Sequence, residues 1–533
     1  MTPSDQPAEG YPTGGYGAVG TPDGGGRDGV VFPMVEGRRS SSSTGRAVVA
    51  DAVRALDPAL ADDVLAIKDW RSGYLEPFRR MTEFDLTLAG AAVTAGAAGL
   101  ASVHRRFVVA HAGQDLPLGD AVRAGLDPVR VPALHTASVT GSAEPDRTLS
   151  VPYRGGRLAG AALDRQLDVW LEHGVAEPSF AKAVRAVVAN PDWLDLRDVT
   201  VVVLGAGAEM GPTVSLLRWG AHVVAVDLPR PAIWRRLLET ARAGAGRLTV
   251  PVSRWLPASA PDDEIAAAAG VDLLTGTGDL LAWLAALPGP FVLGNYVYTD
   301  GADHVRTTVA VDALTAELLA LRDDVSLAFL ATPTDVFGVP AEVVEDARRR
   351  YAGGSGGVGR VGRRLAGVGR AATAGLLWRP NYPGLSALPD GTPAGLADSL
   401  VPQQGPNYAL AKRIQRWRAV HERSAGRTVS VNVAPATRTR SVTRNRLLAG
   451  AYAGAHRFGV EVFDPSTSNT LMAAMLVHDL CDPGSVANPA VPLSHPLELL
   501  WSGANHGGLW RTPYAPRSVL GLAVVLGMVQ RSA

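Results

Sequence analysis

Residues 200–211 have the sequence TVVVLGAGAEMG, which joins a run of β-branched and apolar residues directly to a glycine-rich segment. A continuous apolar run of this length is typical of a strand that is buried on both faces of a parallel sheet. Glycines placed directly after such a strand allow a tight turn and a close approach of the backbone to a bound group. The stretch therefore predicts the first strand and turn of an α/β fold.

Strand and helix patterns alternate through the rest of the chain. We expect strands at 223–226, 248–252, 271–274, 291–293, 325–330, 429–433 and 460–463. We expect helices at 233–243, 279–287, 309–321, 408–423 and 445–456. This alternation predicts a doubly wound parallel sheet of the Rossmann type, with helical regions on its N-terminal and C-terminal sides.

The domain organisation follows from changes in composition. A segment rich in Gly, Pro and Ser cannot cover an apolar face, whereas apolar residues spaced by three and four indicate helices. We expect a disordered tail at 1–44, a mainly helical N-terminal region at 45–190, a Rossmann core at 198–352, a flexible Gly/Pro-rich insertion at 353–405, completion of that core at 406–465, and a helical C-terminal region at 466–533.

Composition narrows the range of partners. The 51 basic and 51 acidic side chains cancel, which argues against a nucleic-acid partner. The single Cys481 excludes a disulfide framework, and the spacings of His478, His495 and His506 match no standard zinc pattern. The sequence has no apolar run long enough to predict a membrane span, and its first residues do not resemble a secretory signal. We expect a cytoplasmic protein that acts on a small molecule and holds no metal. The oligomeric state is left open, with a homo-oligomer as one alternative.

The glycine-rich segment predicts a dinucleotide site. Its backbone can approach a pyrophosphate, while the next helix points its unpaired N–H groups at the phosphates. The candidate binding residues in this segment are Gly205, Ala206, Gly207, Glu209, Met210 and Gly211. Asp227 follows the second strand, twenty residues beyond Gly207, where its carboxylate can accept hydrogen bonds from ribose hydroxyls.

The position of further residues in the sheet refines the choice of ligand. The charge of Asp227 would repel a 2′-phosphate and favours NAD, whereas Arg230 keeps NADP as an alternative. Asn295 is a candidate for contact with the nicotinamide ribose, and Asp279 for contact with the adenine. An S-adenosylmethionine-dependent methyltransferase is a third alternative, although Val203 stands where such enzymes usually carry an acid.

Tyr408 and Lys412 form a candidate catalytic pair, because residues four apart lie on one helix face. Lysine occurs only three times in the chain, so a tyrosine at this spacing is unexpected by chance. An ammonium close to a phenol lowers the pKa of the phenol toward neutrality. The phenol can then exchange a proton with a substrate oxygen while hydride moves to or from a nicotinamide.

These segments together resemble the short-chain dehydrogenase/reductase superfamily, especially its extended branch. Residues 309–321 and 325–338 are similar to the helix and the Ser/Thr-rich strand that lead to a Val-Tyr-Gly-like turn in that family. Residues 429–437 are similar to the strand and Pro-containing turn that flank the nicotinamide. The resemblance covers about residues 200–463.

The resemblance implies roles for the candidate residues. Tyr408 would be the acid/base, Lys412 would bind the ribose and tune the tyrosine, and Thr334 or Thr332 would steady the substrate oxygen. The chain is thus expected to be an NAD(P)-dependent oxidoreductase acting on a carbonyl or hydroxyl of a small organic substrate. The alternative from another class is a dinucleotide-binding sensor or scaffold without turnover.

Overall fold

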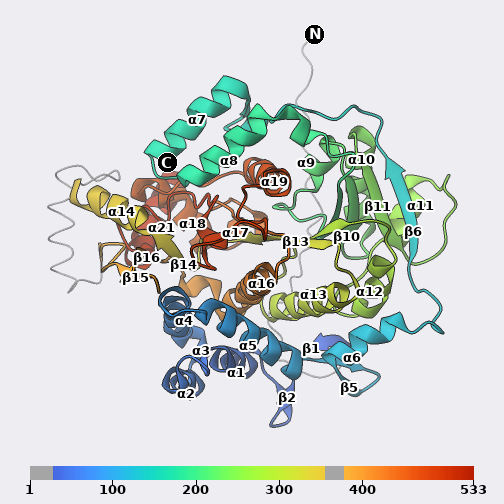
Figure 1. Ribbon diagram of the computed structural model, residues 1–533, viewed down its shortest axis with the longest axis horizontal. Helices are drawn as coiled ribbons and strands as arrows, with labels where there is room; N and C mark the ends of the chain where they lie inside the picture. Colours follow the sequence, from blue (N-terminus) through green and yellow to red (C-terminus); the bar gives the residue numbers. More distant parts are fainter. Residues whose placement is uncertain (1–27, 354–376, 533) are drawn as a thin grey trace.

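A seven-stranded, mostly parallel sheet is the centre of the computed structural model, which describes residues 28–353 and 377–532 (Figure 1). Its strands, in spatial order, are β17 (Val429–Val433), β13 (Val325–Ala331), β12 (Phe291–Asn295), β9 (Thr200–Leu204), β10 (His222–Val226), β11 (Arg247–Val252) and β6 (His135–Thr140). All neighbours pair in parallel except β11 and β6. The predicted α/β class is confirmed at this level, and the sheet is compatible with a Rossmann-like fold.

Helices flank both faces of this sheet, and the side chains of β9 show why. Val201 and Val203 belong to one buried core, while Val202 and Leu204 belong to the other. The first core is completed by α8 (Pro178–Ala189), α9 (Thr213–Arg218), α10 (Pro231–Ala243), α11 (Asp262–Ala268) and α19 (Pro465–Cys481). The second is completed by α12 (Thr277–Ala285), α13 (Ala302–Leu321) and α16 (Pro406–Ser424). A strand that carries apolar side chains on both faces, as β9 does at 201–204, satisfies both cores at once.

The prediction of a disordered tail at 1–44 is wrong for residues 28–44, which are folded. β1 (Gly29–Val31) pairs with β4 (Val108–His111), which pairs with β5 (Gln114–Pro117). β2 (Met34–Val35) and β3 (Arg38–Arg39) form a small hairpin, and Ser40 caps the helix that follows. These strands are two to four residues long, and β1 depends on its pairing with distant β4, so the sequence pattern alone does not reveal them. Residues 1–27 lie outside the described part of the chain.

The N-terminal region contains helices and also short strands. The helices are α1 (Ser41–Val53), α2 (Pro58–Ala66), α3 (Trp70–Gly73), α4 (Leu75–Thr87), α5 (Ala91–Arg106), α6 (Leu118–Arg123), η1 (Ala124–Leu126) and α7 (Gly160–Glu172). The strands β7 (Val151–Tyr153) and β8 (Gly156–Leu158) form a hairpin, and η2 (Pro191–Leu194) precedes β9. This region also supplies β6, which we did not expect in the central sheet.

Two predicted strands were wrong. Residues 271–274 form a turn, in which the Asp272 carboxylate accepts the Leu274 N–H at 2.9 Å. The sheet position beside β11 is already occupied by β6, so a strand from 271–274 has no edge to join there. Residues 460–463 contribute only an isolated bridge between Phe463 and Thr437.

The segment after β13 also departs from expectation. The residues expected to form a Val-Tyr-Gly-like turn lie in β14 (Val336–Pro340), which pairs with β16 (Pro393–Asp398), itself paired with β15 (Ser386–Ala387). The predicted flexible insertion at 353–405 therefore contains two strands and η3 (Pro402–Gln404); its residues 354–376 lie outside the described residues. α14 (Ala341–Gly353) follows β14.

The C-terminal part packs closely on itself. Its helices besides α19 are α17 (Arg440–Arg444), α18 (Arg446–Gly454), η4 (Ala455–Phe458), α20 (Glu498–Trp501) and α21 (Pro516–Ser532). A Cβ on Gly454 would lie 2.1 Å from the carbonyl oxygen of Ala523, and one on Gly527 would lie 2.0 Å from that of Gly450. Glycine is therefore required where α18 and α21 touch.

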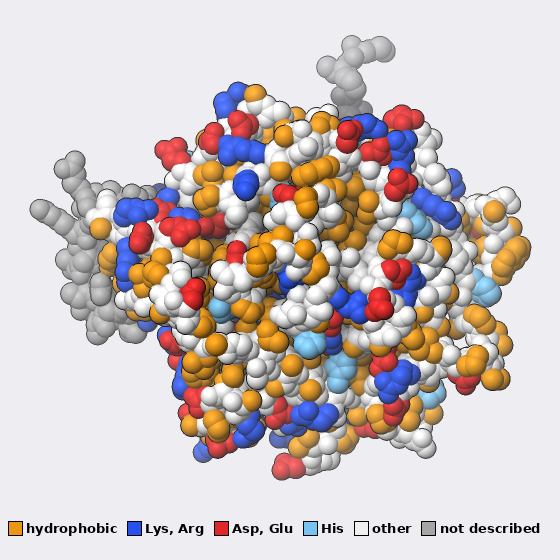
Figure 2. All heavy atoms as spheres, viewed as in Figure 1, with side chains coloured by type: hydrophobic (Ala, Val, Ile, Leu, Met, Phe, Trp, Pro, Cys, Tyr) orange, Lys and Arg blue, Asp and Glu red, His pale blue; other side chains and the backbone are white. Residues whose placement is uncertain are grey.

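Charge and hydropathy at the surface agree with the composition. On the face shown in Figure 2, basic and acidic side chains are interspersed over the elements. Within the described residues, we find no helix with the length and apolar character needed to cross a membrane.

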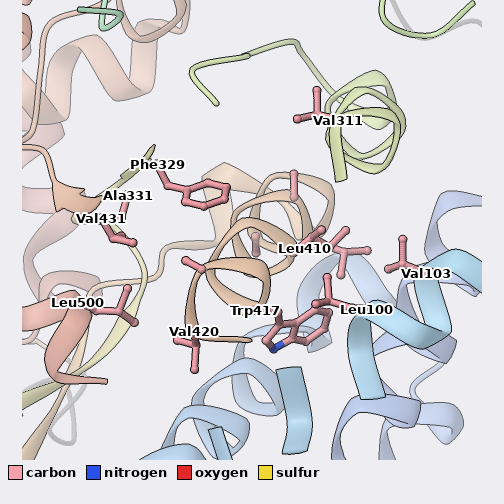
Figure 3. Close-up of a cluster of buried hydrophobic side chains, with 14 of the residues drawn as sticks. Leu100, Val103, Val311, Phe329, Ala331, Leu410, Trp417, Val420, Val431 and Leu500 are labelled. Carbon is pink, nitrogen blue, oxygen red and sulfur yellow. The ribbon is translucent and has the colours of Figure 1, made fainter. Parts of the chain in front are cut away.

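α16 lies between the sheet and the N-terminal helices. Figure 3 shows its Leu410 and Trp417 beside Leu100 and Val103 of α5. α5 approaches closely because Gly99 has no side chain: a Cβ there would lie 2.5 Å from Cζ3 of Trp417. The backbone of α5 and the ring of Trp417 thus fix each other.

We predict that Gly99→Ala destabilises the protein by about 1–3 kcal/mol, because the added methyl overpacks against a buried ring. The matched control is Gly521→Ala in α21, where a Cβ would meet nothing within 4 Å. Better helix propensity should make that control up to about 1 kcal/mol more stable. Urea unfolding measures both variants, and unchanged stability in Gly99→Ala would contradict the packing described here.

Candidate functional site

A cavity of about 1620 Å³ lies at the carboxyl ends of the parallel strands. Its wall includes a residue at or just beyond the end of each of five neighbouring strands: Gly205, Asp227, Asn295, Thr332 and Ala434. The connections from β9 lead to β10 on one side, whereas β12 lies on its other side. Ligands of parallel α/β sheets bind where the strand order reverses in this way.

The glycine-rich loop forms one wall of the cavity, and two of its glycines are required by contacts. Gly205 has φ of +81°, and a Cβ there would lie 3.0 Å from the carbonyl oxygen of Tyr296. A Cβ on Gly207 would lie 2.9 Å from Cγ2 of Ile233 and 3.1 Å from Oδ2 of Asp227. The loop therefore packs against the ends of the two neighbouring strands with no space for a side chain at either position.

Asp227 lines the cavity and also holds the loop in place. Its Oδ2 accepts the Gly207 N–H at 2.8 Å, and its Oδ1 accepts the Leu228 N–H at 2.8 Å. Burial raises the pKa of this carboxyl, and the two backbone hydrogen bonds oppose that rise. A carboxylate oxygen can accept more than one hydrogen bond, so Asp227 can also accept a hydroxyl from a ligand.

Of the other residues predicted to hold a dinucleotide, some line the cavity and some only shape the loop. Glu209 and Met210 line the cavity. Ala206 is buried and its carbonyl oxygen accepts the Thr213 hydroxyl at 2.8 Å, while the Gly211 N–H bonds the carbonyl of Ala208 at 3.0 Å. These two positions shape the loop. The helix that we expected to open near Gly211 is α9, which begins two residues later and has six residues.

Asp279 lies away from the position that we expected. It stands in the first turn of α12, where its carboxylate pairs with Arg130 at 2.9 Å, and it is not part of the cavity wall. Asp272 and Leu273, in the turn at 271–274, line the cavity instead. Asp272 was not predicted to line the site, because its segment was expected to form a strand.

The hydroxyl residues after β13 meet Tyr408 in the cavity wall. Tyr408 and Thr332 both line the cavity, and the Thr332 hydroxyl lies close enough to lower the pKa of the phenol. Thr332 Oγ1 lies 2.9 Å from Thr334 Oγ1. The amide of Gln404 donates to Thr334 Oγ1 at 2.7 Å. Because Gln404 donates at one end, the hydroxyls can donate in series toward Tyr408, which leaves the phenolic hydrogen for another acceptor. Gln404 was not predicted, since nothing in its local sequence marks it.

Lys412 lines the same cavity, one turn along α16 from Tyr408. Its ammonium donates to the carbonyl oxygen of Leu330 at 3.3 Å and to Oε1 of Gln415 at 3.0 Å. Gln415 in turn donates to Oδ1 of Asn295 at 3.5 Å. Burial lowers the pKa of Lys412 to about 8, and the nearby negative charge of Asp335 opposes this. The predicted residues Lys412 and Asn295 thus share one hydrogen-bonded group.

The pKa of Tyr408 differs from our expectation. Burial raises it to about 12, because a phenolate is poorly solvated there; the Thr332 hydrogen bond lowers it and the charge of Asp335 raises it. The ammonium of Lys412 is engaged by the two oxygens described above. At neutral pH the phenol is therefore a protonated donor.

Two further aromatic side chains surround Tyr408. His304 stacks on it with ring centroids 5.4 Å apart, and Tyr298 meets it edge-on at 6.2 Å. Burial and the charge of Lys412 lower the pKa of His304 to about 3, so its ring is neutral. Its Nδ1 accepts the Thr299 N–H at 3.4 Å, and its Nε2 has no hydrogen-bond partner among the described residues. The fold brings this group in from α13.

A contact across the cavity joins the glycine-rich loop to α17. The Glu209 carboxylate accepts the Arg440 N–H at 2.9 Å and lies 3.1 Å from Nε of the same arginine. Arg440 and Arg444 both line the cavity. In the described parts of the chain, no group of three or more His, Cys, Asp or Glu side chains is placed to hold a metal ion.

No protein-family model, curated protein or solved structure matches this chain. What the cavity can do follows from its own residues: a glycine loop with a carboxylate at one end, and a phenol, hydroxyls and an ammonium beside it.

We predict that Lys412→Met stabilises the protein by about 1–3 kcal/mol at pH 7, because the lowered pKa means that charging this amine costs folding energy. Below pH 8 the amine is charged in both the folded and the unfolded chain, so the gain is complete. It should shrink as pH rises from about 8 to the ordinary lysine value. Urea unfolding across this range measures it, and the exposed Lys182→Met is the control. A gain that stays constant with pH would contradict the assignment.

Proposed function

We propose that the protein is an oxidoreductase that uses a nicotinamide dinucleotide to interconvert a carbonyl and a hydroxyl group of an organic substrate. One observation carries the proposal: the glycine-rich loop and the Tyr408–Thr332 pair line the same cavity. We propose further that the sheet is a doubly wound Rossmann sheet. Its six parallel strands, numbered along the chain, lie in the order 3-2-1-4-5-6, which is the order of dinucleotide-binding folds.

The residues of the loop fit a dinucleotide. The positions where a Cβ would clash, Gly205 and Gly207, are those at which a backbone can come close to a pyrophosphate. Asp227 retains acceptor capacity for a ribose hydroxyl, which favours NAD. Arg230 and Arg236 line the same wall, so NADP is the alternative to be tested.

Tyr408 fits the role of proton donor in carbonyl reduction. When bound, the nicotinamide supplies the hydride chemistry. The raised pKa keeps the Tyr408 hydroxyl protonated, and the series of hydroxyls behind it frees its hydrogen for a substrate oxygen. Thr334 and Gln404 orient Thr332, whose single hydroxyl hydrogen then points to the Tyr408 oxygen. A protonated phenol favours reduction over oxidation at neutral pH.

A sensor or scaffold that binds a dinucleotide without turnover is the second candidate. The observation in its favour is that the Lys412 ammonium donates to Leu330 and Gln415, and the phenol of Tyr408 has a raised pKa. A methyltransferase that uses S-adenosylmethionine is the third candidate, since an acid after the second strand can also bind its ribose.

We expect the protein to bind NADH more tightly than NADPH and not to bind S-adenosylmethionine, as measured by fluorescence titration. Gly207→Val should weaken NADH binding about tenfold or more, because the new side chain displaces the loop. Gly384→Ala is the control, since a Cβ there meets nothing within 4 Å. Binding of S-adenosylmethionine alone would overturn the oxidoreductase proposal.

We expect Tyr408→Phe to lower kcat by about 100-fold or more, because the variant has no phenolic proton to transfer. The assay follows NADH oxidation with a panel of aldehydes and ketones, and NADH affinity should stay unchanged. Tyr351→Phe is the control, because Tyr351 lies outside the cavity wall. Wild-type protein that binds NADH but reduces no member of the panel would favour the sensor.

A further inference from the structure

The cavity continues past Tyr408 into the C-terminal part of the fold. Its far wall is formed between α18, η4 and α21, and we call this part the distal chamber. The residues that define it are Leu448, Ala451, Ala455, Val460, Leu520 and Ala523. All six are aliphatic, whereas the loop end of the cavity carries the charged side chains of Asp227, Asp272 and Arg236. The cavity is thus polar at one end and apolar at the other.

The distal chamber adjoins the reactive group. Tyr452 of α18 also lines the cavity, and the pKa of its hydroxyl is raised by burial and by the proximity of Tyr408. The chamber therefore begins beside the phenol that we propose as proton donor.

The walls of the distal chamber are fixed and offer little to a polar ligand. The hydroxyl of Thr512 is already used by the carbonyl oxygen of Phe458, at 2.7 Å. The close contact of Gly454 with Ala523 sets the spacing of α18 and α21. An apolar chamber of defined shape favours an apolar occupant, because burying hydrocarbon there removes it from water.

The size of the cavity allows such an occupant in addition to a coenzyme. Pockets for one small ligand measure about 300–1000 Å³, and this cavity measures about 1620 Å³. The excess volume and the two unlike ends indicate two ligand parts of different polarity.

We propose that the distal chamber binds the hydrocarbon tail of an amphiphilic substrate, whose carbonyl group lies at Tyr408 and Thr332. The reacting end rests on the function proposed above. In the reaction the carbonyl carbon takes a hydride from the reduced coenzyme and the oxygen takes the Tyr408 proton. The products are an alcohol and the oxidised coenzyme, and solvent returns a proton to the phenol. The substrate class is therefore long-chain aldehydes and ketones.

Binding without turnover tests the distal chamber by itself. The probe is 11-(dansylamino)undecanoic acid, displaced from the full-length protein by ethanol, hexanol or decanol in the absence of coenzyme. Affinity should rise by up to about fourfold for each added methylene. Equal displacement by short and long alcohols would overturn the proposal.

A pair of neighbouring leucines supplies a matched variant and control. Leu448 faces the distal chamber, whereas Leu447 is 53% exposed and is not part of the cavity wall. Leu448→Trp should fill the chamber and weaken decanol binding about tenfold or more, with little effect on NADH binding. Leu447→Trp should bind decanol as the wild type does. If Leu448→Trp unfolds, Leu520→Trp on the facing helix repeats the test.

The two proposals fail in different ways. If decanol binds more tightly than ethanol and Leu448→Trp abolishes this difference, but the protein reduces no carbonyl compound, the proposal for the distal chamber holds and the oxidoreductase proposal fails. Turnover of short aldehydes with no preference for longer ones would sustain the oxidoreductase and reject the chamber. If both Leu448→Trp and Leu520→Trp bind decanol as tightly as the wild type, the hydrocarbon tail lies elsewhere and the proposal for the distal chamber also fails.

Discussion

Two buried arginines of α16 share one buried carboxylate, and the site depends on that contact. Arg416 Nη1 lies 3.0 Å from Asp335 Oδ2, and Arg413 Nη2 lies 3.5 Å from Asp335 Oδ1. A buried charge that loses its partner costs several kcal/mol, so the contact fixes both the rotation and the position of α16 along its axis. Asp335 directly follows Thr334 in the segment after β13, and Tyr408 precedes the arginines on α16. The same ion pairs therefore set the distance between phenol and hydroxyls.

A second pair of buried charges holds the other end of this helix. Arg418 reaches Asp312 of α13 at 2.8 Å, and the pKa of Asp312 is lowered by the arginine despite its burial. α13 also carries His304, which stacks on Tyr408. The helix that bears the phenol is thus tied to both elements that surround the phenol, so the site is formed by α16, α13 and the end of β13 acting together.

The strands of the core were predictable because their signal is local. β9 is apolar at almost every position, and a strand covered on both faces has no other composition open to it. β6 has the opposite character: its sequence HTASVT is mostly polar, and it becomes a strand only by pairing with β11 more than a hundred residues away. β1 was missed for the same reason, since it depends on β4. The turn at 271–274 was misread because an apolar run does not reveal that the sheet edge is already filled.

The residues of the candidate site could be predicted only where the local sequence has a recognisable pattern. Tyr408 and Lys412 stood out because lysine is scarce and their spacing is helical, whereas Thr332 and Thr334 were indicated by the resemblance of residues 325–338 to a known strand and turn. His304 and Gln404 carry no such pattern, since only the packing of α13 and η3 brings them to the phenol. The pKa of Tyr408 is raised, where we expected it to be lowered. Burial decides this shift, and the spacing of Tyr408 and Lys412 in the sequence carries no information on burial.

The close glycine contacts between α18 and α21 have a practical consequence for work with the protein. α21 is a wall of the cavity, and Ala523 lies within that wall. Shortening the chain by that helix would open the interior to solvent.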